Sequence, residues 1–109
     1  MRIVLLLAIW LISSASFASE AKKFEALAMK CNYQAMRNLA YAYQTGDFGA
    51  VKSMEKACVW RAAILMSGSK EVDVTDIDNY EIACSRVQKV SKASLTTIDA
   101  QQLVRKICK

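Results

Sequence analysis

Residues 35–68 read AMRNLAYAYQTGDFGAVKSMEKACVWRAAILMSG, and the pattern of this stretch decides the fold. In its first part, apolar residues share one stripe of a helix: Met36, Leu39, Ala40 and Tyr43. We expect Gly46 to end that helix. In its second part, apolar residues from Met54 to Met66 spread over most sides, which is typical of a central helix. Because only a short loop separates the two parts, we predict two antiparallel helices packed as a hairpin.

The same stretch carries a second pattern, of small, aromatic and glycine positions. Its members are Ala35, Leu39, Tyr43, Gly46, Gly49, Val51, Lys56, Ala57, Trp60 and Gly68. The pattern resembles a single Sel1-like repeat, a relative of the tetratricopeptide repeat, and covers about a third of the chain, whereas such solenoids need about three copies. The resemblance implies a helical hairpin that binds other proteins. Ile64 and Leu65 stand where the family has a small pair, so we expect something other than a standard repeat to pack there.

The first 18 residues have the features of a secretory signal peptide. Met1 and Arg2 form a positive start, and the apolar run at residues 3–12 is too short to span a bilayer, which takes about 20 residues. Ser16 and Ala18 are the small residues before a cleavage site. We predict cleavage after Ala18 and a single domain over residues 19–109, periplasmic or secreted and without a stable membrane anchor. An uncleaved N-terminal anchor is the alternative, which the short apolar run disfavours.

Four cysteines follow the predicted cleavage site: Cys31, Cys58, Cys84 and Cys108. An even number in a small exported chain predicts two disulfides, which would support a marginal core. A zinc site is disfavoured because the chain has no His and no Cys-x-x-Cys pair. Three connectivities are possible. Cys58 and Cys84 fall near the middles of two adjacent, antiparallel helices, so we predict that they pair and leave Cys31 to Cys108.

Helical patterns continue on both sides of the hairpin, so we predict an all-α fold without a sheet. The predicted helices begin at Glu20, after Asn32, near Ser53, at Thr75 and near Ser91 or Ser94. The first ends near Lys30, and the helix from Thr75 has Asp78 in a capping box. Its apolar stripe comprises Ile77, Tyr80, Cys84 and Val87. Leu27 of the first helix and Ile98 of the last are assigned to apolar stripes as well.

Arg61 interrupts the apolar face of the hairpin's second helix. We expect its long side chain either to reach solvent or to pair with an acid.

The charge of the chain is modestly basic. Lys and Arg number 15 against 10 Asp and Glu, and loss of Arg2 with the signal peptide lowers the formal net charge from +5 to +4. The basic residues stand singly or in pairs, so a nucleic-acid partner is not expected. A solvated basic surface that favours acidic partners or anionic envelope components is the simpler interpretation.

Neither a metal nor a catalytic site is predicted. Asp73, Asp76 and Asp78 have a spacing that suits calcium, but the mid-loop Gly and the bidentate Glu of a helix-loop-helix site are missing, and helix capping explains the same residues. Without His, a serine nucleophile would need a lysine base. Ser69-Lys70 and Ser91-Lys92 offer adjacent serines and lysines, but such pairs are common in loops and at helix starts. We therefore predict no enzyme and no cofactor.

The aromatic residues divide into core and candidate contact positions. Tyr43 and Trp60 lie at repeat positions that pack the hairpin. Tyr33, Tyr41 and Phe48 are candidates for anchoring a protein or peptide partner, with scattered surface aromatics as the alternative. The predicted function is an exported interaction module in the bacterial envelope; the alternative is an exported inhibitor or immunity protein against an envelope hydrolase.

Overall fold

A computed structural model describes residues 20–88 and 93–109, and this part of the chain is helical without strands. After a helical segment at residues 20–28 come four labelled helices. They are α2 (Tyr33–Thr45), α3 (Met54–Met66), α4 (Val74–Gln88) and α5 (Ala93–Ile107). The predicted all-α fold is confirmed. The predicted signal peptide at residues 1–18 and the possible helix start at Ser91 lie outside the described residues.

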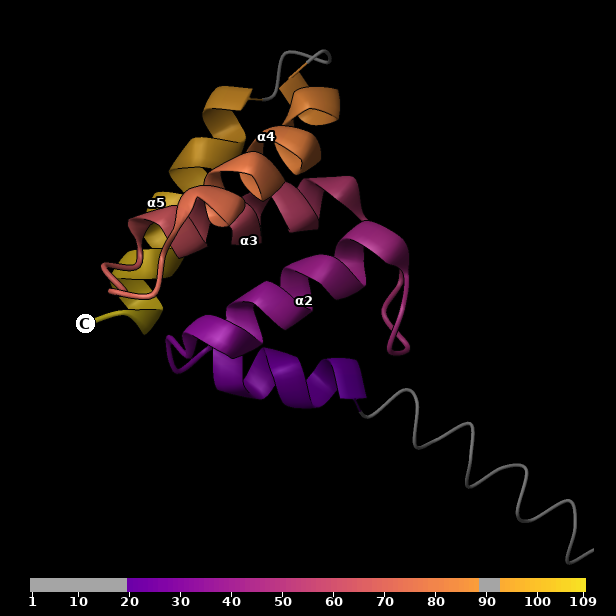
Figure 1. The fold of residues 1–109 in the computed structure, drawn as a ribbon, viewed down its shortest axis with the longest axis horizontal. Coiled ribbons are helices and arrows are strands. Elements are labelled where there is room, and N and C mark those ends of the chain that lie inside the picture. The colour runs from indigo at the N-terminus through magenta and orange to yellow at the C-terminus, as the bar shows by residue number, and fades with distance from the viewer. Residues whose placement is uncertain (1–19, 89–92) are drawn as a thin grey trace, which may run out of the picture.

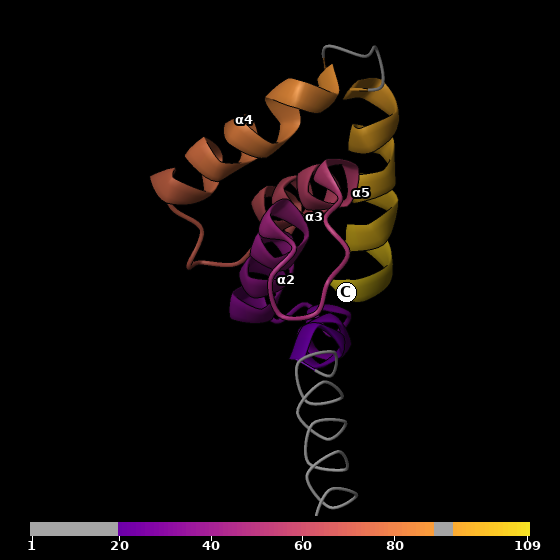
Figure 2. The same cartoon turned by 90° about the vertical axis from the view of Figure 1, so that its right-hand side faces the viewer.

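Helix α3 is the centre of the arrangement. It contacts α2, α4 and α5, and Figure 2 shows it between α4 and α5. In Figure 1, α2 and α3 lie side by side and run in opposite directions around the loop at residues 46–53. This central position explains why α3 is buried on several sides. The likeness of the pair to a Sel1-like repeat stays a prediction.

The core consists largely of small side chains. The buried alanines are Ala28, Ala35, Ala40, Ala42, Ala57, Ala62, Ala63, Ala83 and Ala100. Larger side chains complete the main cluster, among them Met36, Leu39 and Ile64 at 1% exposure or less, and Trp60 at 8%. Alanines allow helices to approach closely but remove little apolar area from water per residue. A core of this kind benefits from covalent support, which the disulfides provide.

The residues between the first helical segment and α2 cap the end of the first helix and the start of the second. Cys31 adopts a left-handed φ of 61°, its N–H donates to the Ala28 carbonyl, and the N–H of Asn32 donates to the Leu27 carbonyl. This pair of hydrogen bonds is a common way to end a helix, and the left-handed residue in it is usually glycine, where this chain has Cys31. The Asn32 side chain then accepts the N–H of Ala35 at 2.9 Å, so Asn32 ends one helix and starts the next, as predicted.

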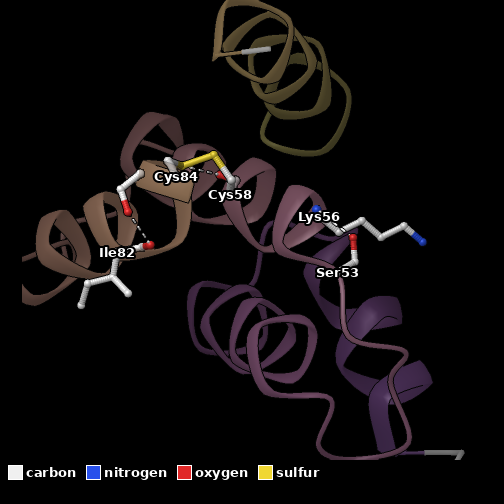
Figure 3. Close-up of a disulfide and its surroundings, with 6 residues drawn as sticks. Ser53, Lys56, Cys58, Ile82 and Cys84 are labelled. Atoms are coloured by element: carbon white, nitrogen blue, oxygen red, sulfur yellow. Dashed lines mark hydrogen bonds between the residues drawn. A yellow bond between two sulfur atoms is a disulfide. The ribbon is translucent and has the colours of Figure 1, made fainter. Parts of the chain in front are cut away.

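Both predicted disulfides are present, Cys31–Cys108 and Cys58–Cys84. The first joins the turn before α2 to the residue after α5. The second joins the middle of α3 to α4, as Figure 3 shows, and Cys84 Sγ also contacts the Cys58 carbonyl at 3.6 Å. The neighbouring cap in Figure 3, Ser53 Oγ accepting the N–H of Lys56 at 3.3 Å, starts α3 near the predicted residue.

Helix α4 starts earlier than predicted. The capping box is formed by Asp73 and Asp76, not by Thr75 and Asp78. Asp73 Oδ1 accepts the N–H groups of Thr75 at 2.9 Å and Asp76 at 3.3 Å. In return, Asp76 Oδ2 accepts the N–H of Asp73 at 3.1 Å. Asp76 is fully buried, while Ile77, which we assigned to the apolar stripe, is 46% exposed. The assignment of Ile77 was wrong because Asp76 takes the buried position, whereas Tyr80, Cys84 and Val87 of the same stripe pack in a core cluster as predicted.

Two more apolar assignments are corrected by the structure. Leu27 in the first helical segment and Ile98 in α5 are 46% and 47% exposed. Leu103 and Ile107 of α5 do pack against the main core, as predicted.

Candidate binding site

A polar cavity opens between α2, α3 and α4, with a volume of about 300 Å³. Its lining residues are Gln34, Arg37, Asn38, Tyr41, Arg61 and Asn79. The first four follow one another at spacings of three, one and three residues on α2, so they lie on one face of that helix. Arg61 comes from α3 and Asn79 from α4. We call this feature the arginine cavity.

Arg61 is buried at one wall of the arginine cavity, with only 4% of its surface exposed. Its hydrogen bond is a long one, 3.4 Å from Nη2 to Gln44 Oε1, and its buried Nε has no partner among the described residues. Burial lowers the pKa of Arg61, and the nearby Arg37 charge lowers it further, while Asp76 opposes the change. The expectation that Arg61 reaches solvent or pairs with an acid was therefore wrong.

Asp76 is the charged group that contacts Arg37, one of the residues lining this cavity. Its Oδ2 accepts the Tyr33 hydroxyl at 2.6 Å in addition to the Asp73 N–H. Its Oδ1 lies 3.3 Å from Arg37 Nε, an attraction between charges without the alignment of a hydrogen bond. The carboxylate therefore ties α2 to α4 and holds one side of the Arg37 guanidinium.

Tyr33 does not lie on the exposed face where we expected it. The residue is 8% exposed, and burial together with its bond to Asp76 raises the pKa of its phenol to about 12. Its ring faces the Arg37 guanidinium at 5.5 Å. Tyr33 therefore helps to position Arg37 in the arginine cavity and is too buried to anchor a partner directly.

The other two candidate anchors do lie at the surface, and they lie together. Tyr41 is 46% exposed and Phe48 37%, with ring centroids 6.3 Å apart. Phe24 contacts Phe48 edge to face at 5.3 Å. We call these three residues the aromatic surface. Tyr41 also lines the arginine cavity, so the two features adjoin each other.

Phe48 is held in an unusual backbone conformation. Its φ is 60°, a left-handed value that is rare for a bulky side chain, and its carbonyl accepts the N–H of Ala21 at 3.1 Å. The turn therefore places Phe48 against the first helical segment at an energetic cost, which in other proteins often accompanies a binding or catalytic role.

Three of the residues considered for metal or catalytic roles, Asp73, Asp76 and Ser69, form local structural hydrogen bonds. Asp73 and Asp76 cap α4, and no group of three possible metal-ligating residues occurs within residues 20–88 and 93–109. Ser69 Oγ accepts the N–H of Glu71 at 3.2 Å, which is a turn contact, and Ser91-Lys92 lies outside the described part. In that part of the chain, no helix is both long and apolar enough to cross a membrane.

No protein-family model, curated protein or solved structure matches this chain.

Proposed function

We propose that the chain is an exported interaction module that binds a protein or peptide through its aromatic surface. The observation that carries the proposal is the contact of exposed Tyr41 and Phe48 with each other and with Phe24. Aromatic side chains that contribute most to binding cluster in this way, because a large apolar area is buried at a small entropic cost. Rings that contact one another at the surface indicate a binding site more strongly than the same rings would if they were scattered.

The scaffold supports this proposal by limiting the motion of the aromatic surface. The Ala21 to Phe48 hydrogen bond fixes the loop, and the Cys31–Cys108 disulfide ties the turn between the first helical segment and α2, which carry Phe24 and Tyr41, to the residue after α5. A surface that is ordered before binding loses less conformational entropy when the partner arrives. The disulfides also suit an oxidising compartment, in agreement with the proposed signal peptide.

Affinity capture from an envelope extract tests the proposal. The disulfide-bonded protein is used as bait beside a Tyr41→Ala/Phe48→Ala variant. Val51→Ala is the matched control, because Val51 is an apolar residue of the same loop and is 84% exposed. A partner that the wild type and the control retain, and that the double variant loses, supports the proposal. A partner retained equally by all three contradicts it.

The captured partner also distinguishes the two proposed forms of the function. An envelope hydrolase whose activity falls on binding identifies an inhibitor or immunity protein. A partner without such an activity identifies an interaction module. N-terminal sequencing of the same preparation tests export, since a cleaved signal peptide leaves Ser19 as the first residue.

A further inference from the structure

We propose that the arginine cavity binds a carboxylate group, held by the guanidinium groups of Arg37 and Arg61. The proposal adds to the proposed function by naming one chemical group of the partner. It rests on the proposed function in one respect, that the carboxylate belongs to the bound partner. The cavity's volume of about 300 Å³ is at the small end of ligand sites, which suits one side chain or one chain end.

The buried guanidinium of Arg61 has no carboxylate paired with it among the described residues. A buried cation is unfavourable unless a counter-ion or several hydrogen bonds compensate the lost hydration. Among the described residues, Arg61 has one long bond to the neutral Gln44 and no carboxylate in ion-pairing contact. An anion in the cavity would supply the missing counter-ion, and the site needs little rearrangement to receive it.

The balance of charges around the cavity also favours a carboxylate. Arg37 and Arg61 bring two positive charges to the cavity, and the fully buried Asp76 brings one negative charge. The remaining charge is that of one cation, which a carboxylate neutralises and a doubly charged phosphate would exceed. Asp76 is already occupied on Oδ2 by Tyr33 and Asp73, so it cannot turn toward Arg61 without losing both bonds.

The hydrogen-bond donors of the cavity are also placed to suit a carboxylate. Arg37 meets Asp76 through Nε, which leaves its terminal N–H groups for a ligand, and a guanidinium suits the two oxygens of a carboxylate. Gln34 Nε2 donates to Asn38 Oδ1 at 3.0 Å, so the NH₂ group of Asn38 is oriented away from that bond. Asn79 adds another amide from α4. The lining is therefore rich in donors.

The position of Tyr41 connects this cavity to the proposed function. Tyr41 lines the cavity and contacts Phe48 at a centroid distance of 6.3 Å. A partner segment with an apolar side chain on the aromatic surface would bring a neighbouring carboxylate to the arginines. The partner chemistry that fits both features is a peptide that carries an acidic residue or a free C-terminus beside an apolar residue.

The test is a nuclear magnetic resonance titration that follows the arginine Nε–Hε signals of the full disulfide-bonded protein at constant ionic strength. The compounds are N-acetyl-glutamate amide, its neutral counterpart N-acetyl-glutamine amide, N-acetyl-alanine with a free carboxylate, and inorganic phosphate. We expect saturable shifts of the Arg61 signal by one or both carboxylates with a dissociation constant of roughly 1 to 50 mM, as suits so small a ligand. The stronger carboxylate identifies an acidic side chain or a chain end as the source.

Variants show whether the arginines bind the carboxylate. Arg61→Gln should weaken binding at least about tenfold, the effect of losing a charged hydrogen bond. Its binding is followed by the Arg37 signal, and its fold is checked by circular dichroism. Arg37→Lys keeps the positive charge but loses the planar guanidinium that can donate two hydrogen bonds to one carboxylate, so it should also weaken binding. Lys52→Gln makes the same charge change at an exposed residue outside the cavity lining, and should bind as the wild type does.

Several results would overturn the proposal: no saturable shift with either carboxylate, equal shifts with the glutamine compound, tighter binding of phosphate, or unchanged binding in a folded Arg61→Gln protein. These results are independent of partner capture. Carboxylate binding without a captured partner would contradict the proposed function alone, and capture without carboxylate binding would contradict this inference alone.

Discussion

The Tyr33 hydroxyl donates a 2.6 Å hydrogen bond to Oδ2 of Asp76 and joins α2 to α4 across 43 positions of the chain. The same oxygen accepts the N–H of Asp73 and so caps α4. Asp76 is fully buried and lies 3.3 Å from the Arg37 guanidinium. One carboxylate thus sets the start of a helix, the packing of that helix against α2, and the position of an arginine of the cavity.

Asp76→Asn should destabilise the protein by about 2 to 4 kcal/mol, because it keeps the shape of the side chain but removes the charge that Arg37 and Tyr33 contact. Asp78→Asn is the matched control, since Asp78 is an exposed acid on the same helix and should change the stability by less than about 0.5 kcal/mol. Urea unfolding of the two variants measures the difference. Equal midpoints for both would show that the Asp76 contacts do not stabilise the fold.

The raised pKa of the Tyr33 phenol predicts that the fold loses stability in alkaline solution. Burial and the bond to Asp76 raise its pKa from 10.0 to about 12, so the unfolded chain releases the phenol proton first as the pH rises. The contribution of Tyr33 is complete below pH 10 and disappears between pH 10 and about 12. The free energy of unfolding should therefore fall more steeply in this range for the wild type than for Tyr33→Phe. Parallel curves would contradict the raised pKa.

Trp60→Ala should cost about 3 to 5 kcal/mol, since the residue is 8% exposed and belongs to the main core cluster. The surrounding alanines cannot fill the space that the indole leaves. Thermal and urea unfolding measure the loss, with Val51→Ala as an exposed control. A Trp60→Ala midpoint within error of the wild-type value would place the indole outside the core.

The two disulfides should stabilise unequally. The loops that they close span 77 and 26 residues, for which the chain-entropy model gives about 4.5 and 3.5 kcal/mol. Paired Cys→Ala replacement of Cys31 and Cys108 should therefore lower the unfolding free energy more than that of Cys58 and Cys84. Non-reducing peptide mapping checks the pairing itself, and a Cys31–Cys58 peptide would contradict it. A larger loss from the shorter loop would mean that chain entropy is not the dominant effect.

The sequence was informative where a pattern has one physical cause. Helical periodicity, Gly46 as a terminator and Asn32 as a cap are local features, so the helices and their approximate starts could be predicted. The pairing of Cys58 with Cys84 followed from two adjacent helices whose short connecting loop makes them antiparallel and brings their middles together. The start of α4 was misplaced because Asp73, Thr75 and Asp76 are all capable caps, and only tertiary contacts select among them.

The candidate site was less accessible to sequence reasoning. Tyr33, Tyr41 and Phe48 were equal candidates in the sequence, which did not show that Tyr33 is buried. The contact of Phe48 with Phe24 depends on the left-handed turn at Phe48. The arginine cavity was missed altogether. One signal was present, the polar stripe of Gln34, Arg37, Asn38 and Tyr41 on α2, but such a stripe is usually a solvated face. Burial of Arg61 and Asp76 against it could not be predicted, because hydropathy assigns charged residues to the surface.

The dissociation constant of the captured partner measures directly whether Tyr41 and Phe48 bind it, as proposed. Titration calorimetry should give a value about a hundredfold higher for Tyr41→Ala/Phe48→Ala than for the wild type, as expected for two aromatic anchors of about 1 to 2 kcal/mol each. Val51→Ala should stay within about twofold of the wild type, since it lies outside the aromatic contacts. Equal dissociation constants for the wild type and the double variant would contradict the claim.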